Sequence, residues 1–206
     1  NTQLAMMNVS PQDKVYELCS KIEAAASRAA EFTRQLLAFS RKQVLELKIV
    51  ALNGLVADFE KMIHRVIGEN IEMSISYKDY LPMIKADSGQ INQVLLNLIM
   101  NAREAMPSGG RITLKTDLMY IDEKQVHLYP DASIGNYVML SIRDTGTGIE
   151  KEVLNKIFEP FYTTKTSGTG LGLSVVYGIV KQHDGFIHVD SRPSIGTTFN
   201  IFLPAK

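Results

Sequence analysis

The periodicity of apolar and polar positions differs between the first part of the chain and the rest. After Ser10, apolar or small side chains recur at alternating steps of three and four residues, at Val15, Leu18, Ile22, Ala25, Ala29, Phe32, Leu36 and Phe39. This spacing is typical of a long helix that packs lengthwise against other helices. Ser10 followed by Pro11 predicts the start of that helix. A helix that lies on its own domain is the alternative interpretation.

After about residue 46 the pattern changes to short segments that differ in period. Helical periodicity predicts helices at 53–67, 88–105, 150–157 and, after a run of glycines, 168–183. Alternation predicts strands at 71–77, 111–120, 136–143, 185–191 and 197–203. We therefore expect a helical region, 1–46, and an α+β domain, 47–206. The second is expected to be a two-layer α/β sandwich, a mixed sheet with helices on one face.

Composition narrows the classes of function. Lys+Arg and Asp+Glu both number 22 among the 206 residues, so the formal net charge is zero. This balance argues against broad binding to nucleic acid or to a membrane surface. Cys19 is the single cysteine, which fits a reducing compartment, and a cytoplasmic location is expected. No apolar run approaches the roughly 20 residues of a membrane-spanning helix. The sequence leaves open whether the parent protein is bound to a membrane.

The helix predicted at 88–105 carries two stripes. Its apolar stripe consists of Ile91, Val94, Leu95, Leu98, Ala102 and Ala105. Beside it runs a polar line of Gln93, Asn97, Asn101 and Glu104. Asparagine is a mediocre helix former, and solvated faces usually carry Lys and Glu, so the line indicates the rim of a site. An amide oxygen is a hard ligand that suits Mg²⁺. A solvated helix face is the alternative.

Two glycine-rich segments could approach a ligand closely. "DTGTGI", residues 144–149, places an acid at a strand end, where Asp144 could accept a hydrogen bond from an exocyclic amine such as that of adenine. "SGTGLGL", residues 167–173, opens a helix, where glycine amides and the helix dipole favour anionic oxygens. Ordinary turns are the alternative for each segment alone. Between them, "FEPFYTTK" ends in Lys165 and reads as a lid over phosphates.

The order of these motifs, with "GTTF" at 196–199, resembles the ATP-binding domain of sensor histidine kinases. That domain belongs to a superfamily shared with type II topoisomerases, mismatch-repair ATPases and large heat-shock chaperones. The resemblance covers about residues 47–206 and implies the Bergerat-type ATP-binding fold. "FTRQLLAFSRKQ", residues 32–43, looks like the end of the second dimerisation helix, particularly in hybrid kinases.

The resemblance also implies roles for single residues. Asn101 would hold Mg²⁺, Asp144 would contact the adenine amino group, and Thr197 would support the adenine through water. Glycines 168, 170 and 172 would donate amides to the triphosphate, under a lid formed by 158–169. The expected ATP-binding residues are Asn97, Asn101, Glu104, Asp144, Gly146, Gly148, Ile149, Thr164, Lys165, Gly168, Thr169, Gly170, Leu171, Gly172, Leu173 and Thr197.

Asn97 decides between kinase and ATPase interpretations. Superfamily ATPases have a glutamate at this position, which activates water, whereas an amide is a very poor base. The implied reaction is transfer of the γ-phosphate of ATP to a histidine, followed by relay to an aspartate of a response-regulator receiver domain. A homodimer is implied for the parent protein.

The sequence departs from the family pattern in its histidines. His64, His127, His183 and His188 all lie outside the first helical region. The resemblance places the phosphoacceptor upstream of Asn1, so this chain is expected to bind nucleotide without autophosphorylating. The alternatives are an ATPase or conformational clamp of the same superfamily, a serine kinase of the anti-sigma type, a mitochondrial-type relative, and a non-catalytic nucleotide-binding scaffold.

Overall fold

The computed structural model describes residues 6, 9–10, 13–22, 26, 45–68, 70–129, 131–165 and 168–206. Contacts between residues divide the chain into two compact units, Asn1–Val44 and Leu45–Lys206. The boundary lies two residues before the one expected from the sequence.

The described part of the first unit contains helical residues 14–22. The Asp13 carboxylate accepts the N–H of Val15 at 2.9 Å, so Asp13 provides the cap expected of Ser10. Val15, Leu18 and Ile22 are about half exposed within this unit. The other positions of the predicted seam lie outside the described residues: Ala25, Ala29, Phe32, Leu36 and Phe39.

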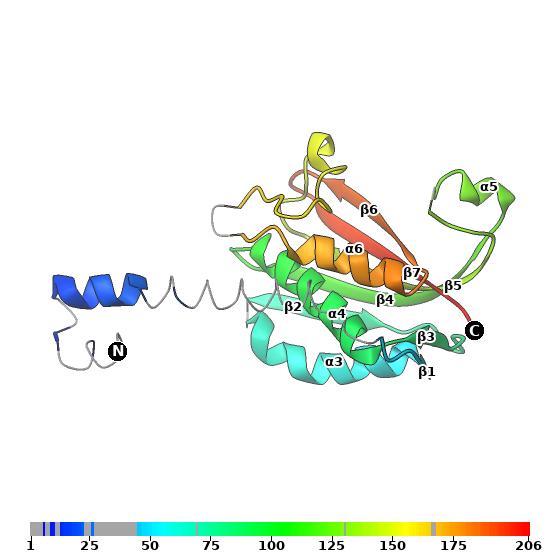
Figure 1. The fold of residues 1–206 in the computed structure, drawn as a ribbon, viewed down its shortest axis with the longest axis horizontal. Coiled ribbons are helices and arrows are strands. Elements are labelled where there is room, and N and C mark those ends of the chain that lie inside the picture. Colours follow the sequence, from blue (N-terminus) through cyan, green and yellow to red (C-terminus); the bar gives the residue numbers. More distant parts are fainter. Residues whose placement is uncertain are drawn as a thin grey trace. The chain divides into compact units, whose positions relative to one another are not determined.

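The second unit is built on a five-stranded sheet (Figure 1). Its strands lie in the order β2 (Ile71–Ser76), β4 (Gly110–Ile121), β5 (Gly135–Asp144), β7 (Gly196–Pro204) and β6 (Phe186–Arg192). The β2–β4 pair is parallel, and the other three pairs are antiparallel. The predicted mixed sheet is therefore confirmed.

Three helices cover one face of this sheet: α3 (Leu52–Ile67), α4 (Ser88–Glu104) and α6 (Gly172–Gln182) (Figure 1). The apolar stripe of α4 faces the core, as predicted, through Ile91, Val94, Leu95, Leu98 and Ala102. Ile99 is buried as well, whereas Ala105, also predicted for the stripe, is the C-cap of the helix and is not among its buried residues. Inward residues of the strands, such as Leu140 and Ile201, complete this core. The two-layer α+β architecture is thus confirmed.

A histidine joins the two helices that carry the predicted phosphate site. His183 caps the C-terminus of α6, and its Nδ1 lies 2.8 Å from the carbonyl oxygen of Ile179. Its Nε2 accepts the backbone N–H of Asp87 at 3.0 Å, which requires the neutral ring with its proton on Nδ1. Asp87 also caps α4, since its carboxylate accepts the N–H groups of Gly89 and Gln90. His183 therefore has a structural role.

The structure corrects the helix predicted at 150–157. Only a single 3₁₀ turn, η1 (Lys151–Val153), forms there, and turns follow it. Further bonds from Lys156 to Val153 and from Glu159 to Lys156 keep the i→i−3 pattern. The segment is a short run before Pro160, and so few residues do not sustain an α-helix. Its apolar side chains still pack on the core, which explains their spacing.

Three short elements were not predicted. β1 (Lys48–Val50) pairs antiparallel with β3 (Ile84–Ala86), and α5 (Glu123–Val126) lies between β4 and β5. Three or four residues are too few to establish a period. A second apolar cluster contains the rings of Phe186 and Phe202, which stack at 4.4 Å. The side chains packed against it are Met119, Val126, Tyr129, Ala132 and Met139.

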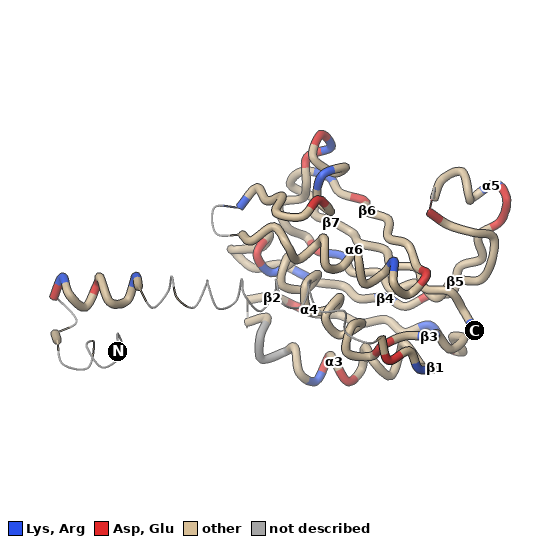
Figure 2. The backbone as a smooth tube through the Cα atoms, in the orientation of Figure 1, with Lys and Arg blue, Asp and Glu red and all other residues tan. Residues whose placement is uncertain are grey.

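Charged residues of both signs are interspersed along the described backbone (Figure 2). Within the described ranges, no helix combines the length and the apolar character that a bilayer crossing requires.

Candidate nucleotide-binding site

The predicted adenine acid, Asp144, is the last residue of β5 and is only 4% exposed. Its Oδ1 accepts the backbone N–H groups of Gly146 at 2.8 Å and of Thr197 at 3.2 Å. Burial raises the pKa of the Asp144 carboxyl above its ordinary value, although these backbone donors and Arg143 act to lower it. Because both backbone donors contact Oδ1, Oδ2 can accept a hydrogen bond from a ligand.

The loop after Asp144 is held closely on two sides. A Cβ on Gly146 would lie 2.7 Å from the Cβ of Ala105, and the N–H of Thr147 donates to the Ala105 carbonyl at 3.1 Å. On the other side, a Cβ on Gly148, which has φ +70°, would lie 2.1 Å from the carbonyl oxygen of Arg192. Glycine is therefore required at both positions for the backbone to pass between α4 and the β6–β7 hairpin.

A pair of hydroxyls links this loop to β7. The Ser191 Oγ accepts the N–H of Ile149 at 2.8 Å, donates to the carbonyl of Gly196 at 3.2 Å, and lies 2.9 Å from the Oγ1 of Thr197. Thr197 is 4% exposed and was predicted, but Ser191 was not. A serine in an alternating strand carries no sequence signal that separates it from an ordinary surface serine.

The phosphate end of the predicted site lies where α6 begins. Among the described residues, no side-chain hydrogen bond caps α6 at its N-cap, Leu171, and an uncapped helix start favours an external acceptor. The Asn97 Nδ2 donates to the carbonyl of Gly172 at 3.3 Å, and the Asn101 Nδ2 lies 3.9 Å from where a Gly172 Cβ would be. The amide line of α4 therefore faces the glycine run, and anions are favoured there.

The glycine run itself is shaped by Phe161. The N–H of Phe161 donates to the carbonyl of Gly170 at 3.0 Å, and a Cβ on Gly170 would lie 2.4 Å from the Phe161 carbonyl carbon. The Leu171 side chain is buried and Leu173 packs against the core, so both anchor the run from below. The Oγ1 of Thr169 lies 3.5 Å from the Leu171 nitrogen.

Lys165 connects the predicted lid to α4. Its Nζ lies 2.5 Å from Glu104 Oε2, and its backbone N–H donates to Thr163 Oγ1 at 3.1 Å. The N–H of Gly168 donates to the Lys165 carbonyl, and Thr164 is exposed. The ion pair is 40% and 50% exposed, so solvent screening makes its contribution to stability small. It brings a cation to the α4 turn after Asn101.

The donor set suits Mg²⁺ only together with phosphate. Among the described residues, no group of three or more His, Cys, Asp or Glu side chains could hold a metal ion. Asn101 offers one amide oxygen beside the anion-favouring end of α6. Mg²⁺ commonly takes one or two protein ligands and completes its octahedron with water and phosphate oxygens, so Asn101 fits that role.

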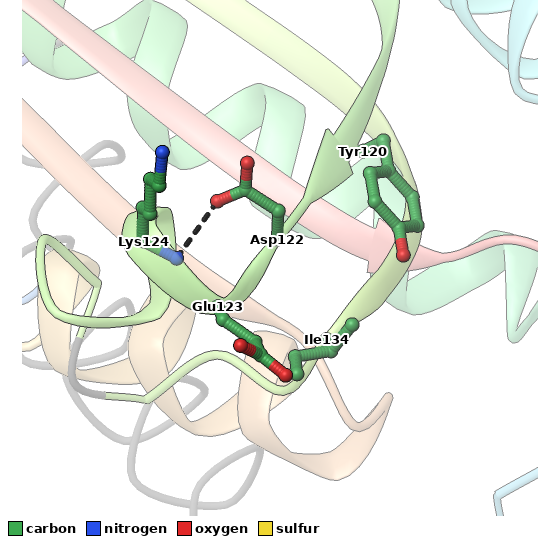
Figure 3. A pocket seen from close by; sticks show the side chains of 5 residues that line it. All are labelled: Tyr120, Asp122, Glu123, Lys124 and Ile134. Carbon is green, nitrogen blue, oxygen red and sulfur yellow. Dashed lines mark hydrogen bonds between the residues drawn. The ribbon is translucent and has the colours of Figure 1, made fainter.

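Two open hollows among the described residues lie elsewhere. One, of about 340 Å³, is lined by Tyr120, Asp122, Glu123, Lys124 and Ile134 around the start of α5 (Figure 3). The other is lined by Ile67, Gly68, Asn70, Ile71, Arg103, Met106 and Pro107. Neither contains Asn101, Asp144 or the glycine run. The candidate site is identified by its donors and acceptors.

Comparison with known proteins decides the family. The family described as "Histidine kinase-, DNA gyrase B-, and HSP90-like ATPase" matches residues 86–206, more than half of the chain. The chain belongs to this family. The resemblance seen in the sequence is thereby confirmed, and the family places an ATP-binding domain of the histidine kinase type in the second unit.

Similar proteins agree with this assignment. The sensor kinase CckA of Brucella abortus is 47% identical over 207 residues, covering 99% of this chain and 22% of CckA. The nucleotide-free catalytic domain of the histidine kinase ThkA is 32% identical, with a TM-score of 0.64 over 78% of this chain and 96% of that one.

A longer ThkA structure, in complex with the response regulator TrrA, is 27% identical, with a TM-score of 0.74 over 98% of this chain and 55% of that one. The chain spans between 22% and 38% of the first three curated relatives it matches.

Proposed function

We propose that residues 45–206 bind Mg²⁺-ATP with the adenine at Asp144 and the triphosphate between α4 and the start of α6. One observation carries this proposal: the loop after the buried Asp144 carboxylate and the glycine-rich start of α6 both contact α4, the first at Ala105 and the second at Asn97. The carboxylate suits the amino group of adenine, and the helix end suits phosphate oxygens.

Asn101 is the proposed Mg²⁺ ligand, and Asn97, Glu104 and Lys165 border the phosphates. Bound Mg²⁺ would neutralise charge on the triphosphate oxygens. Lys165, already beside α4, is positioned to contribute a second positive charge from the lid. The backbone amides of Gly168, Gly170 and Gly172 are the remaining proposed phosphate donors, with Thr164 and Thr169 beside them.

The proposed reaction is transfer of the γ-phosphate to a histidine. Asn97 carries an amide, and its Nδ2 already donates to the carbonyl of Gly172, so it offers no carboxylate base to activate water. With water a poor nucleophile at this site, the phosphate is kept for an imidazole nitrogen, which needs no deprotonation by Asn97. Among similar proteins, CckA is named a sensor kinase.

The proposed partners follow from the same chemistry. A response-regulator aspartate is the expected acceptor of the phosphohistidine phosphate, and a related histidine kinase has been crystallised with a response regulator. Residues 1–46 are proposed to belong to the dimerisation region of a homodimeric parent protein. Since the reaction consumes ATP, we place it in the cytoplasm.

Phosphotransfer in trans tests this function. The chain is mixed with Mg²⁺, γ-labelled ATP and the dimerisation unit of a sensor histidine kinase that carries its acceptor histidine. We expect acid-labile, alkali-stable label on that unit, none on the chain alone, and none on a unit with His→Gln at the acceptor. Label released only as inorganic phosphate would instead support the ATPase alternative.

A further inference from the structure

Two hydroxyl groups beside Asp144, those of Ser191 and Thr197, share hydrogen bonds, and each has one proton to donate. Ser191 and Thr197 are directly paired across β6 and β7, and their hydroxyl oxygens lie 2.9 Å apart. Thr197 also contacts Asp144 Oδ1 through its backbone N–H. The orientation of the Thr197 hydroxyl is therefore decided next to the proposed adenine-binding carboxylate.

Counting protons assigns each bond a direction. A serine hydroxyl has one proton and two lone pairs. The N–H of Ile149 occupies one lone pair of Ser191, and the carbonyl of Gly196, which can only accept, takes the proton. The remaining lone pair of Ser191 must then accept the proton of Thr197. All three contacts are satisfied only when Thr197 directs its proton away from the ligand.

We propose that Ser191 is a positioning residue that presents Thr197 as a hydrogen-bond acceptor, and thereby selects 6-amino purines over 6-oxo purines. This inference rests on the proposed binding of ATP at Asp144. Asp144 Oδ2 and Thr197 Oγ1 then form a pair of acceptors, facing the base directly or through water. The 6-amino group of adenine has two N–H donors to offer them. Hypoxanthine offers an acceptor at position 6 and a single donor, its N1–H, so at most one of the two protein acceptors is matched.

Removing the Ser191 hydroxyl frees the Thr197 proton. In Ser191→Ala, Thr197 can rotate and donate to a 6-oxo group, so discrimination between the two bases falls. Loss of the contact with the Ile149 N–H also loosens the loop after Asp144, but that change weakens the binding of both nucleotides alike. The ratio of the two affinities therefore separates the positioning role from a merely structural one.

The test is a pair of calorimetric titrations, with Mg²⁺-ATP and with Mg²⁺-inosine triphosphate, whose bases differ in the group at position 6 and in the proton on N1. We expect Ser191→Ala to narrow the ratio of dissociation constants by roughly two- to tenfold, the range of one net hydrogen bond. Ser191→Cys should narrow this ratio as well, because cysteine is nearly isosteric with serine but its thiol is a poor hydrogen-bond donor. Ser194→Ala removes an exposed hydroxyl from the same hairpin and should leave the ratio unchanged.

A double-mutant cycle completes the design. In a Thr197→Val background, Ser191→Ala should not change the ratio further, because the hydroxyl it orients is gone. Three results would each overturn the role of Ser191. They are a ratio of dissociation constants that neither Ser191 variant changes, an equal change of that ratio by Ser191→Ala in the Thr197→Val background, and equal affinity of the wild type for both nucleotides. A wild type that binds neither nucleotide would instead contradict the proposed function itself.

Discussion

Asp144 is a carboxylate whose burial works against the stability of the free protein. Burial raises its folded pKa above the ordinary value of 3.8, so the ionised form is disfavoured in the folded state. The resulting loss of folding free energy is absent below the ordinary pKa. It grows as the pH rises from the ordinary pKa to the raised folded pKa, and it is fully present above that pKa. Such a cost is typical of a group kept for a ligand, whose donor restores what burial removes.

Asp144→Asn should therefore stabilise the nucleotide-free chain in a pH-dependent way. The asparagine keeps an oxygen for the two backbone donors but carries no charge. We expect a higher free energy of unfolding than wild type at pH 7 and little difference below about pH 4, measured by urea denaturation. Asp79→Asn, in an exposed loop, is the control and should show no such trend. The same difference at both pH values would contradict the assignment.

Gly146 gives a second prediction at the scale of one residue. A methyl group there meets the Cβ and carbonyl oxygen of Ala105 at 2.7 and 2.8 Å, so Gly146→Ala should lower the free energy of unfolding by roughly 1–3 kcal/mol. Gly178→Ala is the matched control, because nothing lies within 4 Å of its added methyl inside α6. That variant should gain up to about 1 kcal/mol. Equal effects in chemical denaturation would show that the loop is not held against α4.

At the scale of elements, α4 and α6 form the phosphate end of the proposed site. The Asn97–Gly172 bond joins them near the glycine run, and the Asp87–His183 bond joins them at the other end. The spacing of the two helices is therefore fixed at both ends by neutral hydrogen bonds, which leaves the polar line of α4 facing the helix N-terminus.

Replacing the amide of Asn97 by a carboxylate tests the choice between kinase and ATPase. Asn97→Glu supplies a base next to the phosphates, so release of inorganic phosphate from Mg²⁺-ATP should rise by roughly tenfold or more over wild type. Asn97→Gln has the same length without the charge and should not raise it. If both variants hydrolysed ATP at the wild-type rate, the residue at this position would not be what limits hydrolysis.

The sequence predicted the long elements well because their periods extend over many residues. The stripe of α4 and the alternation of β4 and β5 both lie where they were expected. The 150–157 segment shows where periodicity misleads, since apolar side chains spaced for a core also fit successive turns. β1 and β3 depend on pairing between distant residues, which no local pattern contains.

The candidate site was predictable where a residue type is chemically unusual for its setting. Two asparagines within an apolar helix and glycines around an acid are such signals. Ser191 is not, because its importance arises only from three partners that the fold brings to one oxygen. Likewise, the contact of Gly146 with Ala105 links positions about forty residues apart, and the sequence alone cannot reveal it.

At the scale of the whole molecule, every candidate site residue belongs to the second compact unit, Leu45–Lys206. Its first residues are tied to α4, since the N–H of Glu46 donates to Asp87 Oδ2 at 3.1 Å. We expect residues 45–206 alone to bind Mg²⁺-ATP within about twofold of the whole chain, measured by calorimetry. A loss of more than tenfold would mean that the first unit contributes to the site.

The most direct test of the central claim is titration of Mg²⁺-ATP and metal-free ATP into wild type, Asp144→Ala and Asn101→Ala. We predict that wild type binds both forms, and that Asp144→Ala weakens both by roughly tenfold or more, because a buried acceptor is lost. Asn101→Ala should weaken only the binding that depends on Mg²⁺. Wild-type affinities in both variants would contradict the proposed site.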